Sequence, residues 1–196
     1  MRVSILVFPG VEELDFVGFL EVLAVANRVV GQRWFDTKLV GTVRGPIECS
    51  GGLKVVPDTT VARPGRADMI FVPGGGASRG VGVDIASKDE RTLELLRSFS
   101  RQRKPVWSVC TGALILGSAG LLNGKRAVTH HGYLNQLKSY GARVVRARTV
   151  TDGEITTGGG ISSSIDVGLE LVRRSLGRKV AGQVKGRMEY HPLRGS

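Results

Sequence analysis

One cysteine of this chain lies where a strand should end and a helix begin. Cys110 is in the segment SVCTG, after the apolar run PVW and before ALILG. A thiol at such a junction has the setting of a nucleophile elbow, and Gly112 gives room for the tight turn. The N-terminus of a helix stabilises negative charge, so this setting would lower the pKa of the thiol. The alternative is a buried cysteine that packs as a small hydrophobic side chain.

A cysteine nucleophile needs a group that takes and returns a proton, and Asp15 is the candidate. It lies inside the otherwise apolar stretch ELDFVGFL, just after the first expected strand. Two adjacent negative charges raise each other's pKa, so we expect Asp15 to be protonated when Cys110 is a thiolate. A carboxylic acid held in this way can later deliver its proton. The alternative is an exposed acid in an early helical turn.

The other chemically versatile side chains give weaker indications. His130 or His131 could orient Cys110, as in cysteine–histidine sites, or could be a strand-end histidine bonded to backbone. No cysteine pair and no HExxH spacing accompanies them, so we expect no metal site. We assign no role to His191, and we interpret Cys49, in an expected hairpin, as structural.

Strands and helices that could position these residues alternate along the chain. Strands are predicted at 2–8, 35–43, 67–76, 105–109, 143–150 and 154–157, with two short ones around Gly51-Gly52. Helices are predicted at 11–30, at 87–103 with Ser87 as N-cap, at 111–122, near 133–140, after the glycine turn TTGGG with a serine N-cap, and near 178–188.

The alternation and the apolar character of the strands predict an α/β fold. Several strands are apolar on both faces, as in a mostly parallel sheet with helices on both sides. We expect one domain over residues 1–196, an open, doubly wound sheet. Sites in such sheets form at the carboxyl ends of strands. This rule selects the loops at 9–15, 73–76, 110–112 and 157–161.

Composition narrows the class of protein. Lys and Arg number 28 against 17 Asp and Glu, a formal net charge of +11. The basic residues are spread along the chain without interleaved aromatics, so we expect a solvated basic surface rather than a nucleic-acid site. No apolar stretch reaches membrane-spanning length, and the first residues are interpreted as a strand rather than a signal peptide. With only two cysteines, we expect a cytoplasmic protein with reduced thiols.

Two glycine-rich segments resemble nucleotide-binding motifs without matching them. GGGASRG (74–80) has its last glycine out of register for a dinucleotide fingerprint and follows a late strand. GLLNGKR (120–126) has too few residues between its glycines for a phosphate-binding loop, and Arg126 stands where a Ser or Thr would bind magnesium. We therefore expect no cofactor.

Five segments together resemble the ThiJ/PfpI superfamily of class I glutamine-amidotransferase-like proteins. They are ILVFPGVEELDFVGFLEVL, FVPGGG, SVCTGALILGSAGLLNGKRAVTHH, TTGGGISSSIDVGLEL and MEYHP. The resemblance spans nearly the whole chain and implies a flavodoxin-like fold and a homodimer. It implies that Cys110 is the nucleophile and Asp15 its acidic partner. It also implies that Thr111 helps to hold the active site in place, and that the N–H groups of Gly75 and Thr111 form an anion-stabilising pocket. Ile161 would line this pocket near the sulfur. His130 occupies a position where several members of the superfamily keep a histidine near the cysteine.

Within the superfamily, the chain is most similar to isonitrile hydratases, which carry Asp where many members have Glu. This implies conversion of a small isonitrile to an N-substituted formamide through a thioimidate on Cys110. Two alternatives stay open. One is another cysteine enzyme of the superfamily, such as an amidase, a peptidase or a glyoxalase-like hydratase. The other is a ligand or redox sensor related to AraC-type regulators.

Overall fold

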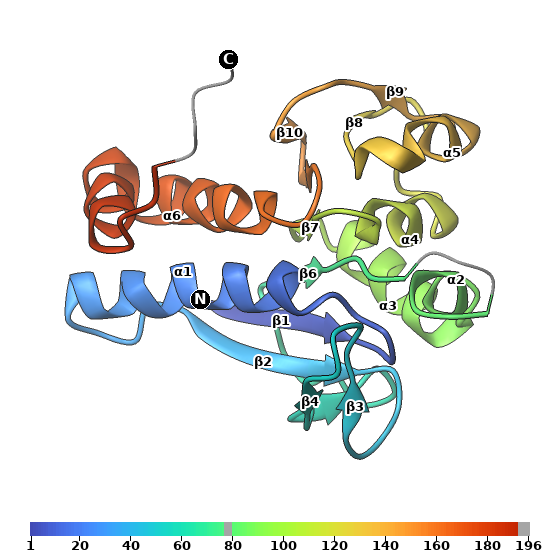
Figure 1. Ribbon diagram of the computed structural model, residues 1–196, viewed down its shortest axis with the longest axis horizontal. Helices are drawn as coiled ribbons and strands as arrows, with labels where there is room; N and C mark the ends of the chain where they lie inside the picture. The colour runs from blue at the N-terminus through green and yellow to red at the C-terminus, as the bar shows by residue number, and fades with distance from the viewer. Residues whose placement is uncertain (77–79, 192–196) are drawn as a thin grey trace.

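A seven-stranded sheet forms the centre of the computed structural model, which describes residues 1–76 and 80–191 (Figure 1). Its strand order is β10-β11-β7-β6-β1-β2-β5. These strands are β1 (Arg2–Val7), β2 (Asp36–Gly41), β5 (Thr59–Thr60), β6 (Met69–Val72), β7 (Val106–Ser108), β10 (Thr149–Asp152) and β11 (Ile155–Gly158). All neighbours run parallel except β10 and β11. The predicted mostly parallel α/β sheet is confirmed.

Helices cover this sheet. They are α1 (Glu13–Val30), α2 (Val83–Ala86), α3 (Glu90–Arg101), α4 (Gly112–Ser118), α5 (Leu134–Ser139), α6 (Ser163–Arg187) and the 3-10 turn η1 (His131–Tyr133). Helices α1 and α6 pack side by side, and α3 and α4 pack on β6 and β7 (Figure 1). Among the helices of the described ranges, none combines the length and apolarity needed to cross a membrane.

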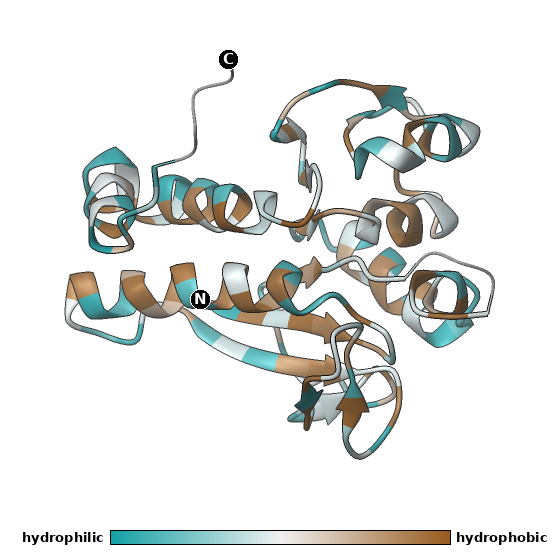
Figure 2. Ribbon diagram, viewed as in Figure 1, coloured by the Kyte–Doolittle hydropathy of each residue, from teal (hydrophilic) through white to brown (hydrophobic). Residues whose placement is uncertain are grey.

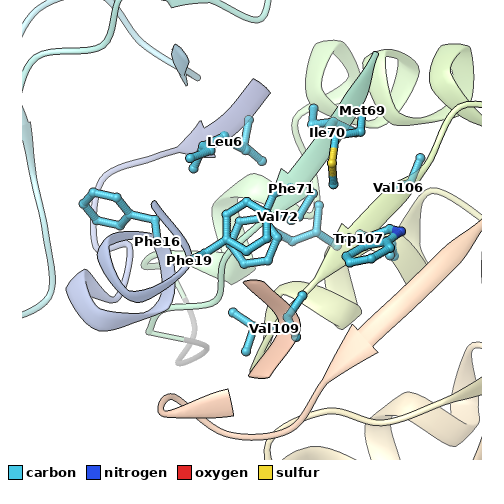
Figure 3. Close-up of a cluster of buried hydrophobic side chains, with 14 of the residues drawn as sticks. Leu6, Phe16, Phe19, Met69, Ile70, Phe71, Val72, Val106, Trp107 and Val109 are labelled. Carbon is cyan, nitrogen blue, oxygen red and sulfur yellow. The ribbon is translucent and has the colours of Figure 1, made fainter. Parts of the chain in front are cut away.

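The core lies between the sheet and the helices. Hydrophobic residues gather on α4 and towards the ends of β1 and β2 (Figure 2). Phe19 of α1 stacks on Phe71 of β6 with ring centroids 3.8 Å apart, and Trp107 of β7 lies in the same cluster (Figure 3). Burial of these large rings fixes α1 on the sheet, because each fully buried aromatic side chain contributes about 2 kcal/mol or more.

Several predicted element boundaries were wrong. Helix α3 begins later than expected, with Asp89 as its N-cap: the Asp89 carboxylate accepts the N–H of Thr92 at 3.3 Å and its hydroxyl at 2.6 Å. Ser87 instead ends the short helix α2, which was not predicted. By contrast, the two helices expected at the C-terminus are confirmed: α6 is broken at Gly177, whose φ of 88° is non-helical, just before the expected start of the last helix at 178.

The predicted strand at 143–150 is divided between two sheets. Strand β9 (Arg143–Val144) pairs with β8 (Arg126–Ala127) in a separate parallel ribbon, while β10 joins the central sheet. The two short strands around Gly51-Gly52 are confirmed as the antiparallel pair β3 (Ile47–Glu48) and β4 (Lys54–Val55). The GGGASRG segment includes residues 77–79, and the tail includes 192–196; both stretches are outside the described residues.

The loops selected from the sequence converge because their strands are neighbours in the sheet. The Glu12 N–H donates to the Gly74 carbonyl at 3.0 Å, and Val11 and Gly75 form an isolated antiparallel bridge. The Cys110 N–H donates to the carbonyl of Gly159 at 2.7 Å. Parallel strands bring their carboxyl ends to one edge, so four segments distant in sequence build one site.

Candidate active site

Cys110 occupies the sharp turn between β7 and α4. Its φ is 54°, a left-handed conformation that non-glycine residues seldom adopt. Its N–H is shared between the carbonyls of Gly158 and Gly159, and the hydroxyl of Thr129 donates to its carbonyl at 2.7 Å. Strained backbone persists only where surrounding contacts hold it, and such residues concentrate at functional sites. These contacts support the elbow expected from the sequence.

Gly112 makes the turn possible for a steric reason. A Cβ atom at this position would overlap the carbonyl oxygen of Val72 and lie 2.7 Å from that of Pro73. Both atoms are backbone of the neighbouring strand end, so they cannot move aside cheaply. The room attributed to Gly112 from the sequence is confirmed.

Asp15 is fully buried in the first turns of α1. One carboxyl oxygen, Oδ2, accepts the Gly74 N–H at 2.7 Å. The other oxygen, Oδ1, has no N–H or O–H donor among the described residues. The Cys110 thiol interacts with this carboxyl and favours its ionised form. The structure thus joins the two residues, and the exposed-acid alternative for Asp15 is wrong.

Burial raises the pKa values of both members of this pair. The pKa of Asp15 rises to about 7, chiefly by desolvation and further by the charge of Glu12, against the Gly74 hydrogen bond. The pKa of Cys110 rises to about 12, chiefly by desolvation and then by the Asp15 charge. The lowered thiol pKa expected from the helix N-terminus is therefore wrong for the free site. Because the pKa of the thiol is raised further than that of the carboxyl, the last proton of the pair resides mainly on sulfur.

Thr111 ties the elbow to the glycine loop after β6. Its hydroxyl donates to the Gly75 carbonyl at 3.0 Å and accepts the Gly75 N–H at 3.0 Å. The Gly75 N–H, expected to help stabilise an anion, is therefore already engaged. The Thr111 N–H and hydroxyl also interact with the Cys110 sulfur and favour its anionic form.

Ile161 contributes its backbone more than its side chain. The Ile161 N–H interacts with the Cys110 sulfur and opposes the rise in the thiol pKa. Its side chain is 36% exposed, at the rim of the site. Two N–H groups, from Thr111 and Ile161, thus face the sulfur, and together they can stabilise negative charge there.

His130 lies beside the site, and its ring binds backbone. Its Nδ1 accepts the Gly132 N–H at 3.2 Å, and its ring borders Gly160, where a Cβ would lie 3.0 Å from the ring. Burial and the neighbouring His131 lower the pKa of His130, which favours the neutral ring. Cys110 titrates under the influence of Asp15, Thr111 and Ile161 instead. This arrangement favours the backbone-bonded alternative for His130.

Three groups that hold the site were given no individual role from the sequence, although Gly74 and Gly159 lie in loops that the sequence selected. Gly74 donates to Asp15 and is so close to Thr111 that a Cβ would lie 2.6 Å from the Thr111 nitrogen. The Thr129 hydroxyl and the Gly159 carbonyl bind the Cys110 backbone. Gly74 could have been chosen from the PGGG loop after a strand, whereas nothing in the sequence marks Thr129.

Other reactive side chains stay apart from this site. Cys49 is buried on the β3–β4 side, where desolvation and the charges of Glu13 and Glu12 raise its pKa to about 11. Within the described part of the chain, no three His, Cys, Asp or Glu side chains group as a metal site would require. Cys110 and Asp15 are the buried thiol and carboxyl that the fold brings together.

Comparison with known proteins agrees with this geometry. The sequence pattern of the DJ-1/PfpI family matches residues 1–174. The chain belongs to the DJ-1/PfpI family. Cys110, Asp15 and the loops that hold them all fall inside the matched range, and so does the whole central sheet.

Relatives of this DJ-1/PfpI protein include an enzyme and a regulator. An isonitrile hydratase of Pseudomonas putida is 41% identical over 192 residues, covering 98% of this chain and 79% of the enzyme. The transcriptional regulator CdhR of Pseudomonas aeruginosa is 30% identical over 183 residues, covering 91% of this chain and 52% of the regulator. The crystal structure of a THiJ/PfpI family protein from Pseudomonas syringae superposes with a TM-score of 0.84 at 30% identity, covering 100% of this chain and 77% of that one.

Proposed function

We propose that this DJ-1/PfpI protein is an isonitrile hydratase that converts R–N≡C to the N-substituted formamide. The observation that carries the proposal is the fully buried Asp15 carboxyl, which interacts with the Cys110 thiol. Hydration of an isonitrile needs one nucleophile and one proton shuttle, and this pair supplies both without metal or cofactor. The similarity to the Pseudomonas putida enzyme supports the same reaction.

The first half-reaction adds the thiol across the terminal carbon of the isonitrile. As the sulfur of Cys110 bonds to that carbon, Asp15 takes the thiol proton and delivers it to the same carbon. The product is the thioimidate R–N=CH–S–Cys110, and Asp15 is left ionised. The Thr111 and Ile161 N–H groups support this step because they stabilise the sulfur while it carries negative charge.

The second half-reaction uses Asp15 as a base. Ionised Asp15 removes a proton from water as the oxygen attacks the thioimidate carbon, and then passes that proton to nitrogen. The tetrahedral intermediate R–NH–CH(OH)–S–Cys110 expels sulfur, and the hydroxyl proton returns through Asp15 to the thiol. The net change is addition of one water to the isonitrile, and the pair again holds its single proton.

The decisive experiment follows product and intermediate by mass spectrometry. Wild-type protein incubated with n-butyl isonitrile should give N-butylformamide, and a rapidly quenched sample should carry the mass of one isonitrile on Cys110. Cys110→Ala should give neither, whereas Cys49→Ala, the matched control at the other buried thiol, should give both. If the wild type yields no formamide, the proposal is wrong, and small amides and methylglyoxal then test the amidase, peptidase and glyoxalase-like alternatives.

A second candidate function is ligand sensing. The similarity to CdhR covers nearly all of this chain but about half of the regulator. This chain would then bind a small molecule without turnover. Retention of an isonitrile in unchanged form by the wild type, and by Cys110→Ala alike, would favour sensing over catalysis.

The homodimer and the cytoplasmic location also stay proposals. Leu14 and Val17, on either side of Asp15 in α1, are exposed hydrophobic residues, and so is Leu53 of the β3–β4 hairpin, whose N–H donates to the Glu13 carboxylate at 3.3 Å. They support a self-complementary contact, because exposed apolar side chains on a shared face favour association. Light scattering of the purified protein, with Val17→Lys as the variant expected to yield monomer, measures this directly.

A further inference from the structure

A hollow lies beside the elbow, on the side of its backbone. It has a volume of about 480 Å³ and is bounded by the segments 128–134 and 146–148 and by the turn before α6. Two of its walls are the groups that hold Cys110 in place. The Thr129 hydroxyl binds the Cys110 carbonyl at 2.7 Å, and the Gly159 carbonyl accepts the Cys110 N–H at 2.7 Å. A molecule in this cavity would therefore touch the scaffold of the nucleophile.

The cavity carries positive charge that the described residues do not neutralise. Arg146 lines it, is exposed, and makes no ion pair or side-chain hydrogen bond within the described ranges. Arg148, also in the lining, differs: it pairs with Asp166 at 2.5 Å and reaches the Tyr190 hydroxyl at 3.3 Å. Among the described lining residues there is no Asp or Glu. Arg146 is thus a free cation at the mouth of a pocket.

The remaining wall suits a hydrocarbon. Val128, Leu134 and Ala147 contribute apolar surface next to Arg146. We infer that this cavity binds a small organic carboxylate, with the Arg146 guanidinium pairing with the carboxylate and the apolar wall holding the hydrocarbon body. A guanidinium presents parallel N–H groups that match the two oxygens of a carboxylate, which makes Arg146 selective for this group over a neutral amide.

The carboxylate can come from either of two sources. It can belong to the substrate, because Gly160 of the cavity wall directly precedes Ile161, whose N–H interacts with the Cys110 sulfur. It can also belong to a separate metabolite that binds behind the elbow. Only the first source rests on the proposed hydratase function; the binding site itself does not.

A binding titration tests the site with simple probes. Hexanoate and hexanamide, equal in length, are titrated into the 15N-labelled protein and followed by NMR. Arg146→Gln should weaken hexanoate binding about tenfold, a loss of about 1.4 kcal/mol, and leave hexanamide unchanged. Arg178→Gln is the matched control: it removes an equal charge from an exposed position on α6 that does not line the cavity.

A second variant tests whether the probes bind in this cavity. Ala147→Leu fills part of the cavity and should weaken both probes, while circular dichroism checks that the fold is kept. Binding of hexanoate with equal affinity by wild type and Arg146→Gln overturns the inference. So does an absence of hexanoate binding to the wild type.

Steady-state kinetics separate the two sources. If the substrate carries the carboxylate, Arg146→Gln should raise the KM for 3-isocyanopropanoate about tenfold and leave that for n-butyl isonitrile unchanged. If the carboxylate belongs to a separate ligand, Arg146→Gln should leave the KM values for both isonitriles unchanged. The same substitution should still weaken hexanoate binding in the titration. If neither isonitrile is converted, the hydratase proposal fails, and the titration alone decides the binding site.

Discussion

Thr111 and Gly75 hold each other through two hydrogen bonds of 3.0 Å, with one hydroxyl serving as both donor and acceptor. The same hydroxyl interacts with the Cys110 sulfur. Its single proton therefore has two acceptors, the Gly75 carbonyl and the sulfur. As negative charge develops on sulfur, the proton can turn towards it, which links the glycine loop to the chemistry of the elbow.

Removing this hydroxyl should impair both stability and activity. Thr111→Val keeps the shape but leaves two polar groups of Gly75 without their partner, at a cost of about 1–3 kcal/mol in unfolding free energy. We expect kcat to fall about tenfold or more. Thr111→Ser, which keeps the hydroxyl, should retain most of both. Urea unfolding measures the loss of stability, and formamide production measures the loss of activity. Equal stability and equal kcat of Thr111→Val and Thr111→Ser would contradict a role for the hydroxyl.

Activity should depend on the ionisation of Asp15. Since its pKa is raised to about 7, Asp15 is protonated at lower pH and cannot take the thiol proton. We expect kcat/KM to fall tenfold per pH unit below about 7 and to be level above it. The profile is measured from pH 5 to 9 with n-butyl isonitrile. A rise centred near 8.5, the value of a free thiol, would show that thiolate formation alone controls the rate.

Replacing Asp15 should lower the pKa of Cys110. Desolvation is the main reason that this pKa is raised, and the Asp15 charge is the next. In Asp15→Asn the second cause disappears and the first stays, so the pKa should fall below that of the wild type yet stay above the free-thiol value. Ultraviolet absorbance of the thiolate, in a Cys49→Ala background, reports this titration. An unchanged thiol pKa would mean that the two side chains do not interact.

The buried Asp15 carboxylate should also reduce stability at alkaline pH. Its folded-state pKa of about 7 exceeds that of an unfolded chain, so the stabilising contribution is complete below about pH 4 and is lost as pH rises through about 7. The full loss corresponds to about 4 kcal/mol. Asp15→Asn, neutral at every pH, should therefore be more stable than the wild type at pH 8 and lose this advantage near pH 4.

Urea unfolding at several pH values measures this difference. Asp68→Asn is the control with the opposite sign, because hydrogen bonds from Arg2 lower the pKa of Asp68 to about 2. That substitution should give no gain in stability at pH 8. If the unfolding free energies of the wild type and of Asp15→Asn change with pH in the same way, Asp15 is not desolvated.

The elbow should not tolerate a methyl group at Gly112. Because that group would overlap the Val72 carbonyl, Gly112→Ala should destabilise the fold by about 3 kcal/mol. Gly182→Ala is the matched control, since a Cβ there meets nothing within 4 Å and lies in α6. It should stabilise the protein by up to about 1 kcal/mol. Thermal unfolding compares them, and similar melting temperatures for both would contradict the packing argument.

The sequence alone predicted most of the residues that reach the site and the loops that carry them. Apolar strands alternating with helices predicted a parallel sheet, and the rule for its carboxyl ends placed Asp15, Gly75, Cys110 and Ile161 together. Gly112 beside Cys110 predicted the sharp turn. These inferences succeeded because local periodicity and turn chemistry are encoded in neighbouring residues.

Only the tertiary structure decided the ionisation of the pair and the partners of the loop groups. Helix position suggested a lowered thiol pKa, but desolvation by side chains from distant segments raises it instead. The Gly75 N–H is engaged by a hydroxyl 36 residues away, and the predicted strand at 143–150 divides because its halves find different partner strands. Burial, and which groups meet across the sheet, depend on long-range packing, and no local pattern in the sequence specifies that packing.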